Sequence, residues 1–119
     1  GYNGFPRGCS DAVLPWARRA PCGDPLHAKY PYVVHAEANA ILNRCGADAR
    51  GATIYVALFP CNECSKVIIQ SGIREVMYLD DWYHDTDACR ANRIMFRMAG
   101  VRLRVYRPWN LEIAMDFEG

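Results

Sequence analysis

The hydrophobic positions along this chain alternate between a helical and a strand period. Apolar residues spaced three and four positions apart indicate helices, whereas continuous or alternating apolar runs indicate strands. From these patterns we predict three helices and three strands in strict alternation. In chain order they cover residues 35–45, 53–58, 62–70, 74–79, 85–98 and 101–106.

The three predicted strands differ in their hydrophobic pattern. Residues 53–58 and 74–79 are rich in apolar and β-branched side chains throughout, which predicts buried strands. Residues 101–106 alternate apolar side chains with arginines, which predicts one solvated face. From residue 108 onward no clear element is predicted.

The predicted helices have recognisable ends and apolar stripes. Gly46 and Gly72 are placed to end the first two, and Gly100 the third. Asp85 suits the N-cap of the third helix. The stripe expected to face the core in the first helix is Ala38, Ile41, Leu42 and Cys45, and in the third helix Ala88, Ala91, Met95 and Met98.

The order of the elements predicts an α/β fold in one domain, residues 1–119. Strands that are joined through a helix run parallel, because a tight hairpin cannot connect them. The last two strands are joined through the helix at 85–98, so we expect them to be parallel.

A long loop precedes the first predicted helix. Residues 3–31 hold five of the seven prolines and three of the nine glycines. Ser10 or Asp11 could cap a short helical turn running to Arg19. Loops of this length in a compact domain are usually functional or disordered, and we favour a functional loop because it leads directly to His35.

Composition restricts the class of protein. The net charge of +1 gives no support for nucleic-acid binding, and no apolar run approaches the length of a membrane span. Six cysteines could form a disulfide framework, but no secretory segment is visible, so we expect reduced thiols and a cytoplasmic location. The cysteines expected to be spare thiols or small core residues are Cys9, Cys22, Cys45 and Cys89.

Two short motifs carry the chemistry. His35-Ala36-Glu37 is followed by Pro60-Cys61-Asn62-Glu63-Cys64, and Cys61 and Cys64 have the spacing that lets two thiolates on one helical turn face one metal. One imidazole and two thiolates with an open fourth position are typical of catalytic zinc. A redox dithiol or a structural zinc site is the alternative, but neither needs Glu37.

The chain resembles the deoxycytidylate (dCMP) deaminase family, within the zinc-dependent cytidine and deoxycytidylate deaminases. The motif pair is common to zinc-dependent nucleobase deaminases. The strings around it point to the dCMP branch. They are Gly1-Tyr2-Asn3-Gly4, Gly8-Cys9-Ser10-Asp11, Lys29-Tyr30-Pro31-Tyr32-Val33, Ala57-Leu58-Phe59-Pro60-Cys61-Asn62-Glu63-Cys64 and Tyr83-His84-Asp85.

The resemblance implies a cytidine-deaminase-like fold, a three-layer α/β/α sandwich around a mixed sheet. Members of the family have a helix and a β-hairpin before the position of Gly1, so the chain is expected to be an N-terminally truncated deaminase domain. Small cytidine deaminases join their last two strands by a turn, whereas the dCMP branch places a helix there. The predicted helix at 85–98 therefore agrees with the dCMP branch.

The resemblance also assigns site residues. It implies zinc held by His35, Cys61 and Cys64, with Glu37 as the catalytic proton shuttle. It places the substrate among Asn3, Ala36 and Tyr83. A solvated first-turn glutamate, a turn asparagine and a surface aromatic are the alternatives for Glu37, Asn3 and Tyr83. The cations that could hold a substrate phosphate are Arg7, Arg18, Arg19 and Lys29.

The implied reaction is hydrolytic deamination of dCMP to dUMP and ammonia, which supplies dUMP for thymidylate synthesis. Such enzymes are hydrolases acting on cyclic amidines, and they assemble as homo-oligomers, often hexamers, with dCTP and dTTP as effectors. Two alternatives stay open. One is a deaminase acting on a base within RNA or DNA, and the other is a catalytically silent regulatory domain that binds zinc.

Overall fold

The computed structural model describes residues 1–17, 23–44, 46–81 and 85–107. The chain forms two compact units, Gly1–Asp48 and Ala49–Gly119. Among the described residues, no helix is both long and apolar enough to cross a membrane.

The first unit is mostly loop around one short helix. An antiparallel bridge joins Gly4 to Val34, with N–H···O distances of 3.1 and 2.7 Å. Residues 10–14 form a hydrogen-bonded turn in which Ser10 Oγ accepts from the Ala12 N–H. The helical turn expected there does not continue as a helix through the described residues, whereas a 3-10 helix, η1 (Pro25–His27), follows later in the loop.

Helix α1 (Ala36–Leu42) is shorter than expected. His35 is its N-cap rather than its first helical residue. At the other end, the Asn43 side-chain amide donates to the Asn39 carbonyl at 3.0 Å, and the Asn43 backbone leaves the helical region. Ile41 is buried as predicted, but Leu42 is 72% exposed because the helix ends there. Cys45 lies outside the described residues.

The second unit is a parallel sheet with two helices. Its strands are β1 (Thr53–Leu58), β2 (Glu75–Asp80) and β3 (Arg102–Val105), in the order β1-β2-β3. Both pairings are parallel, with Thr53 opposite Glu75 and Glu75 opposite Arg102. The α/β class and the parallel last two strands are therefore confirmed.

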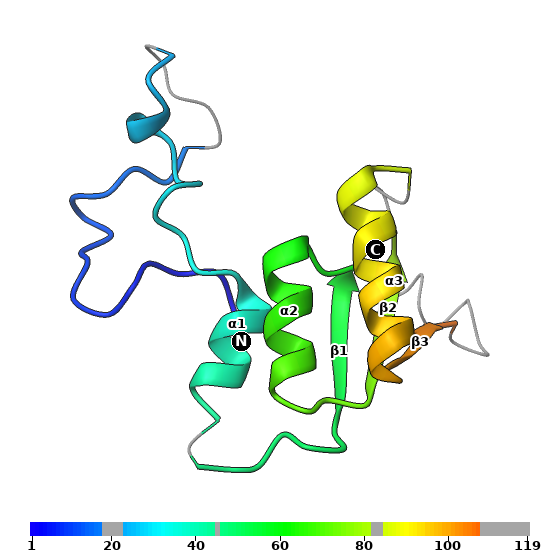
Figure 1. Cartoon of the computed structure of the whole chain (residues 1–119). Helices are drawn as coiled ribbons and strands as arrows, with labels where there is room; N and C mark the ends of the chain where they lie inside the picture. Colours follow the sequence, from blue (N-terminus) through cyan, green and yellow to red (C-terminus); the bar gives the residue numbers. More distant parts are fainter. Residues whose placement is uncertain (18–22, 45, 82–84, 108–119) are drawn as a thin grey trace. The chain divides into compact units, whose positions relative to one another are not determined.

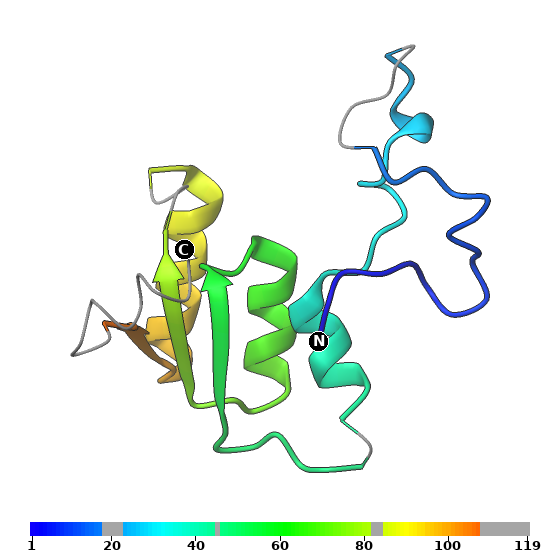
Figure 2. The same ribbon diagram turned by 180° about the vertical axis from the view of Figure 1, so that it is seen from behind.

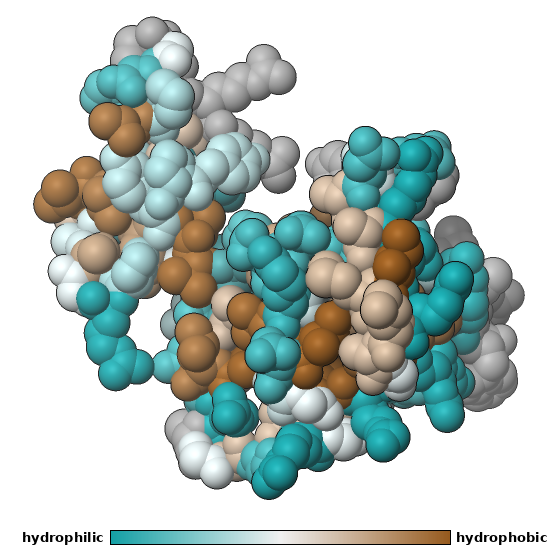
Figure 3. Space-filling view, viewed as in Figure 1, coloured by the Kyte–Doolittle hydropathy of each residue, from teal (hydrophilic) through white to brown (hydrophobic). Residues whose placement is uncertain are grey.

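The connecting helices α2 (Asn62–Gln70) and α3 (Asp87–Ala99) cover one face of this sheet (Figures 1 and 2). Each crossover moves one strand in the same direction, so right-handed connections place both helices on one side. Apolar side chains are visible between α2 and α3, while hydrophilic ones cover the outer side of α2 (Figure 3).

The expectation of strands buried on both faces is wrong for β1 and β2. Val76 is fully buried and Tyr78 is 7% exposed, because they point toward the helices. On the other face, Tyr55 is 71% and Leu79 is 52% exposed. The strands are apolar on both faces, but the two described helices of this unit cover only one of them.

The predicted core stripe of α3 is also wrong. Its buried residues are Cys89, Asn92 and Phe96, whereas Met98 is 84% exposed. The stripe is rotated because a polar residue, Asn92, occupies a core position that the apolar pattern passes over. The N-cap is Thr86, whose hydroxyl accepts from the Cys89 N–H at 3.1 Å, and not Asp85.

Candidate active site

The first unit places His35 and Glu37 at the start of α1. His35 has an extended backbone (φ −68°, ψ 153°), and its carbonyl accepts the first helical hydrogen bond, from the Asn39 N–H at 3.0 Å. The His35 side chain does not cap the helix. Glu37 lies in the first turn of the helix.

The structure brings Asn3 to the same helix start. Its side-chain carbonyl Oδ1 accepts from the Ala36 N–H at 2.9 Å. Asn3 thereby satisfies one of the backbone donors that the first helical turn leaves without a partner. The bridge between Gly4 and Val34 holds the two segments in this register. Three predicted site residues, Asn3, Ala36 and Glu37, therefore lie at one helix terminus.

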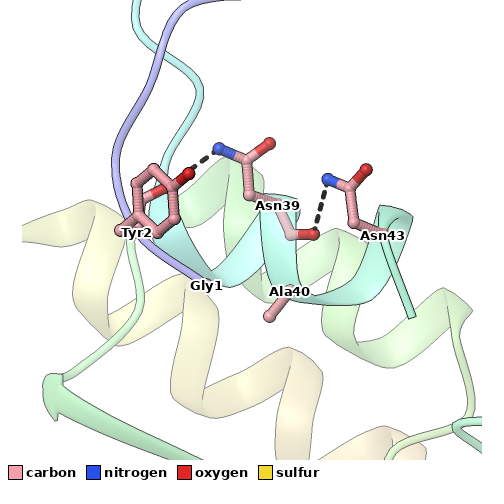
Figure 4. A pocket seen from close by; sticks show the side chains of 5 residues that line it. All are labelled: Gly1, Tyr2, Asn39, Ala40 and Asn43. Atoms are coloured by element: carbon pink, nitrogen blue, oxygen red, sulfur yellow. Dashed lines mark hydrogen bonds between the residues drawn. The ribbon is translucent and has the colours of Figure 1, made fainter. Parts of the chain in front are cut away.

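Sequence patterns missed the role of Asn39 in this arrangement. Its side-chain Nδ2 donates to the Tyr2 carbonyl at 2.9 Å and lies 3.5 Å from the Val34 carbonyl (Figure 4). It ties the segment that carries Asn3 to the helix that carries Glu37. The signal for it in the sequence is a polar residue four positions after His35, at the helix face that meets the loop.

A shallow hollow of about 340 Å³ lies beside this contact. Gly1 lies directly against α1. A Cβ added at Gly1 would be 2.2 Å from the Ala36 carbonyl oxygen. The lining residues are drawn in Figure 4; they are Gly1, Tyr2, Asn39, Ala40 and Asn43.

The second unit presents both motif cysteines at the start of α2. Cys61 is the N-cap, with an extended backbone (φ −69°, ψ 171°), and Cys64 lies one turn on. Cys61 is exposed, and Cys64 is only 3% exposed. Neither cysteine forms a disulfide, and the helix N-terminus favours the thiolate form of each.

The donor set fits zinc. Two sulfur donors from one turn, together with the imidazole of His35, are the nitrogen and sulfur ligands that zinc prefers. The Cys61 side chain does not cap α2, so its sulfur is not used as a capping acceptor. Three protein ligands leave the fourth position of tetrahedral zinc for a water molecule or substrate.

The predicted phosphate contacts are only partly described. Tyr83, Arg18 and Arg19 lie outside the described residues. Arg7 donates from Nη2 to Asn43 Oδ1 at 3.2 Å, and the Lys29 ammonium lies 4.9 Å from the centre of the Trp16 ring. The described contacts of Arg7 and Lys29 therefore give no reason to choose between the two cations.

Arg93, Asp81 and Cys89 form a cluster just after the carboxyl end of β2. Arg93 forms an ion pair with Asp81, and its guanidinium lies 4.6 Å from the centre of the Phe59 ring. The Cys89 thiol lies 3.5 Å from Asp81 Oδ1. Burial raises the pKa of Cys89, and the neighbouring Asp81 carboxylate raises this pKa further. Cys89 is therefore a protonated core thiol at neutral pH.

The family model of the cytidine and deoxycytidylate deaminase zinc-binding region matches residues 1–80. This range includes His35, Glu37, Cys61 and Cys64.

Two curated mammalian proteins are similar over almost the whole chain. Human deoxycytidylate deaminase is 55% identical over 118 residues, and the mouse protein is 53% identical over the same length. The match covers 99% of this chain but 65% of each relative, so the chain spans slightly less than two thirds of their length.

A solved structure of cyanophage S-TIM5 dCMP deaminase, in complex with dCMP and dUMP, has a similar fold. The TM-score is 0.58 at 25% identity, and the match covers 87% of this chain and 68% of that one. The expected cytidine-deaminase-like fold is confirmed.

Proposed function

We propose, from the premise that this chain belongs to the cytidine and deoxycytidylate deaminase family, that it catalyses the hydrolytic deamination of dCMP to dUMP and ammonia. The observation that carries the proposal is its 55% identity to human deoxycytidylate deaminase across 99% of the chain. The cyanophage relative bound to dCMP and dUMP supports the same substrate and product.

His35, Cys61 and Cys64 would hold the zinc ion. Zinc, when bound in such a site, acts as a Lewis acid and lowers the pKa of a water molecule to about 7. Cys61 and Cys64 add the charge of their thiolates at the N-terminus of α2, and the largely buried Cys64 limits access of solvent to its sulfur.

Glu37 would move the protons. Its carboxylate takes a proton from the attacking water and gives it to the ring nitrogen beside C4 of cytosine. It then assists departure of the amino group as ammonia. The position of Glu37 in the first turn of α1, next to Ala36 and its partner Asn3, supports this role.

Asn3 and Ala36 would contact the nucleotide beside Glu37. Their mutual hydrogen bond, 2.9 Å from the Ala36 N–H to Asn3 Oδ1, fixes the position of the Asn3 amide before substrate arrives. Tyr83 would lie near the phosphate, together with one of the candidate cations. Because the Asn3 amide is already held by Ala36, ordering it costs less entropy when the nucleotide binds.

The wider setting follows from the same family. We propose a homo-oligomer, with a hexamer as the expected size, and dCTP and dTTP as effectors. We also propose a cytoplasmic location, where cysteine ligands such as Cys61 and Cys64 are kept reduced.

The function is tested by assaying release of ammonia from dCMP, deoxycytidine, dCTP and a single-stranded oligonucleotide. We expect dCMP to be the preferred substrate. Preference for the oligonucleotide would indicate a polynucleotide deaminase. No turnover of any substrate by zinc-loaded protein would indicate a silent regulatory domain.

The matched control is Glu37→Gln. It keeps the size of the side chain but cannot accept and return a proton, so we expect the rate to fall by about 10²- to 10⁴-fold while zinc content and folding are kept. Near-normal turnover by this variant would remove Glu37 from the mechanism.

A further inference from the structure

The direction of the Cys61 side chain depends on the backbone on both sides of it. Cys61 is an N-cap residue with φ −69° and ψ 171°, so only its carbonyl joins the helical hydrogen-bond ladder, accepting from the Ser65 N–H at 2.8 Å. Its backbone N–H and carbonyl belong to the peptide groups that it shares with Pro60 and Asn62. Contacts to these two residues therefore orient the backbone from which the Cys61 sulfur projects.

Asn92 of α3 contacts both neighbours of Cys61. Its Nδ2 donates to the Pro60 carbonyl at 3.1 Å, and its Oδ1 accepts from the Asn62 Nδ2 at 2.8 Å. Asn92 is 2% exposed, and Pro60 is also fully buried. A buried amide with both ends hydrogen-bonded has one favoured orientation, because rotating it by 180° would place like groups face to face.

The segment that joins β1 to α2, which contains Phe59, Pro60 and Cys61, is also held by other residues of the same unit. The Phe59 N–H donates to the Asp80 carbonyl at 2.8 Å, and the Ser65 hydroxyl donates to the Cys61 carbonyl at 2.8 Å. The Ser65 hydroxyl also lies 3.4 Å from the Pro60 carbonyl, but Ser65 belongs to α2 itself. Asn92 supplies its two hydrogen bonds, to Pro60 and to Asn62, from α3. An apolar side chain could fill its place in the core but could make neither bond.

We propose that Asn92 is a positioning residue for the metal site: it aims the sulfur of Cys61 by fixing Pro60 and Asn62. The inference rests on the proposed function, in which Cys61 is a zinc ligand. Mutation of a residue that orients a metal ligand without touching the metal typically lowers metal affinity by about 10- to 100-fold. Asn92 acts through the Pro60 carbonyl and the Asn62 side chain and not on the metal itself, so its effect is on affinity and ligand geometry.

The first test measures zinc affinity of the full-length protein by competition with a chromophoric chelator. We expect Asn92→Ala to weaken zinc binding by about 10-fold or more. The matched control is Val76→Ala, which removes packing at a fully buried position of β2 and deletes neither hydrogen-bonding partner of Asn92. Both variants are also compared in thermal unfolding without metal, so that loss of stability is separated from loss of affinity.

The second readout is the absorption of the cobalt(II)-substituted protein. Thiolate-to-cobalt bands in the near ultraviolet report sulfur ligation directly, without reference to activity. We expect these bands to shift or weaken in Asn92→Ala and to be unchanged in Val76→Ala. Asn62→Ala removes one of the two hydrogen bonds at a half-buried position, and it gives a smaller change in the same direction even if Asn92→Ala fails to fold.

Unchanged affinity and unchanged cobalt bands in Asn92→Ala would overturn the proposal, as would a loss of affinity no larger than in Val76→Ala. If Asn92→Ala does not fold, the decisive variant is Asn62→Ala. The proposal is then overturned when Asn62→Ala binds zinc as tightly as the wild-type protein and has the same cobalt bands. If the wild-type protein itself shows no thiolate-to-cobalt bands, the assignment of Cys61 as a ligand fails, and the proposed function fails with it.

Discussion

At the scale of single residues, the four described cysteines occupy different chemical environments. Cys9 is exposed in the loop of the first unit, and Cys89 is buried beside the carboxylate of Asp81. Cys61 and Cys64 lie at a helix N-terminus, which favours thiolates. Only the last two combine the spacing and the electrostatic setting of metal ligands.

Replacing Cys64 separates the metal-binding thiols from the others. We expect Cys64→Ala to lose most of its zinc, because one of three protein ligands is gone. Cys9→Ala should keep about one zinc per chain. Zinc content is measured by atomic emission after gel filtration, and full retention of zinc by Cys64→Ala would contradict the ligand set.

The raised pKa of Cys89 predicts a specific dependence on pH. Burial and Asp81 favour the neutral thiol, so its pKa lies above the ordinary value of 9.0 and the reactive thiolate forms only at more alkaline pH. In alkylation followed by mass spectrometry, Cys9 should be labelled first at pH 8, and labelling of Cys89 should accelerate only above pH 9. Removing the nearby charge in Asp81→Asn should move this acceleration to lower pH. Equal labelling of Cys9 and Cys89 at pH 8 would contradict the prediction.

Sequence reasoning at the residue scale starts from short motifs. His35, Cys61 and Cys64 are proposed as ligands from residue type and spacing, and the family resemblance supplies the role of Glu37. Asn39 and Asn92 are not identified in this way, because their roles depend on carbonyl groups of Tyr2 and Pro60 that are far away in the chain. An isolated asparagine in a helix gives no sign of which distant carbonyl it meets.

At the scale of elements, both helices of the second unit end through a left-handed glycine. Gly72 has φ +82° and Gly100 has φ +76°, a region that residues with a Cβ rarely adopt. The two sites differ in their surroundings. A Cβ at Gly100 would meet nothing within 4 Å, whereas one at Gly72 would lie 2.6 Å from Arg50 Cγ and 3.3 Å from Arg50 Cα.

This difference predicts unequal costs of the same substitution. Gly100→Ala should lower the free energy of unfolding by about 1 to 2 kcal/mol, the cost of the left-handed backbone alone. Gly72→Ala should cost more, because the segment carrying Arg50 must also shift. Urea denaturation measures both, and Gly100→Asn is the control that tolerates this backbone. Equal costs at the two glycines would show that the contact with Arg50 relaxes freely.

The elements also show what periodicity can and cannot predict. The helix at 62–70 has the predicted bounds, since Ser71 and Gly72 end it as their residue types indicate. The buried face of α3 is mispredicted because Asn92 and Cys89 form part of it while Met98 does not. A hydrophobicity pattern cannot identify a buried polar side chain whose partners lie on another element.

At the scale of the whole molecule, charge favours a small substrate over a polymer. With 14 Lys and Arg against 13 Asp and Glu, the chain has almost no excess of positive charge to neutralise a phosphate backbone. A mononucleotide needs only a local phosphate site. Such a site discriminates strongly, because donors that are desolvated against a phosphate are left without partners when the ligand lacks it.

We therefore expect kcat/KM for dCMP to exceed that for deoxycytidine by about 10³-fold or more. The ratio is measured from initial rates with each substrate at equal ionic strength. Replacing the cation that contacts the phosphate should reduce the ratio while zinc content is unchanged. Comparable kcat/KM values for the two substrates would exclude phosphate recognition.

The hydrogen bonds around Cys61 also constrain when the protein can acquire its metal during synthesis. Asn92 follows Pro60 by 32 residues, and most of α3 follows Asn92. A ribosome that has just released the two cysteines has not yet released the helix that shapes their loop. Thiolates in that nascent segment can be oxidised or take the wrong ion. If Asn92 positions Cys61 as we propose, correct metallation is a late event, completed once α3 has docked on α2.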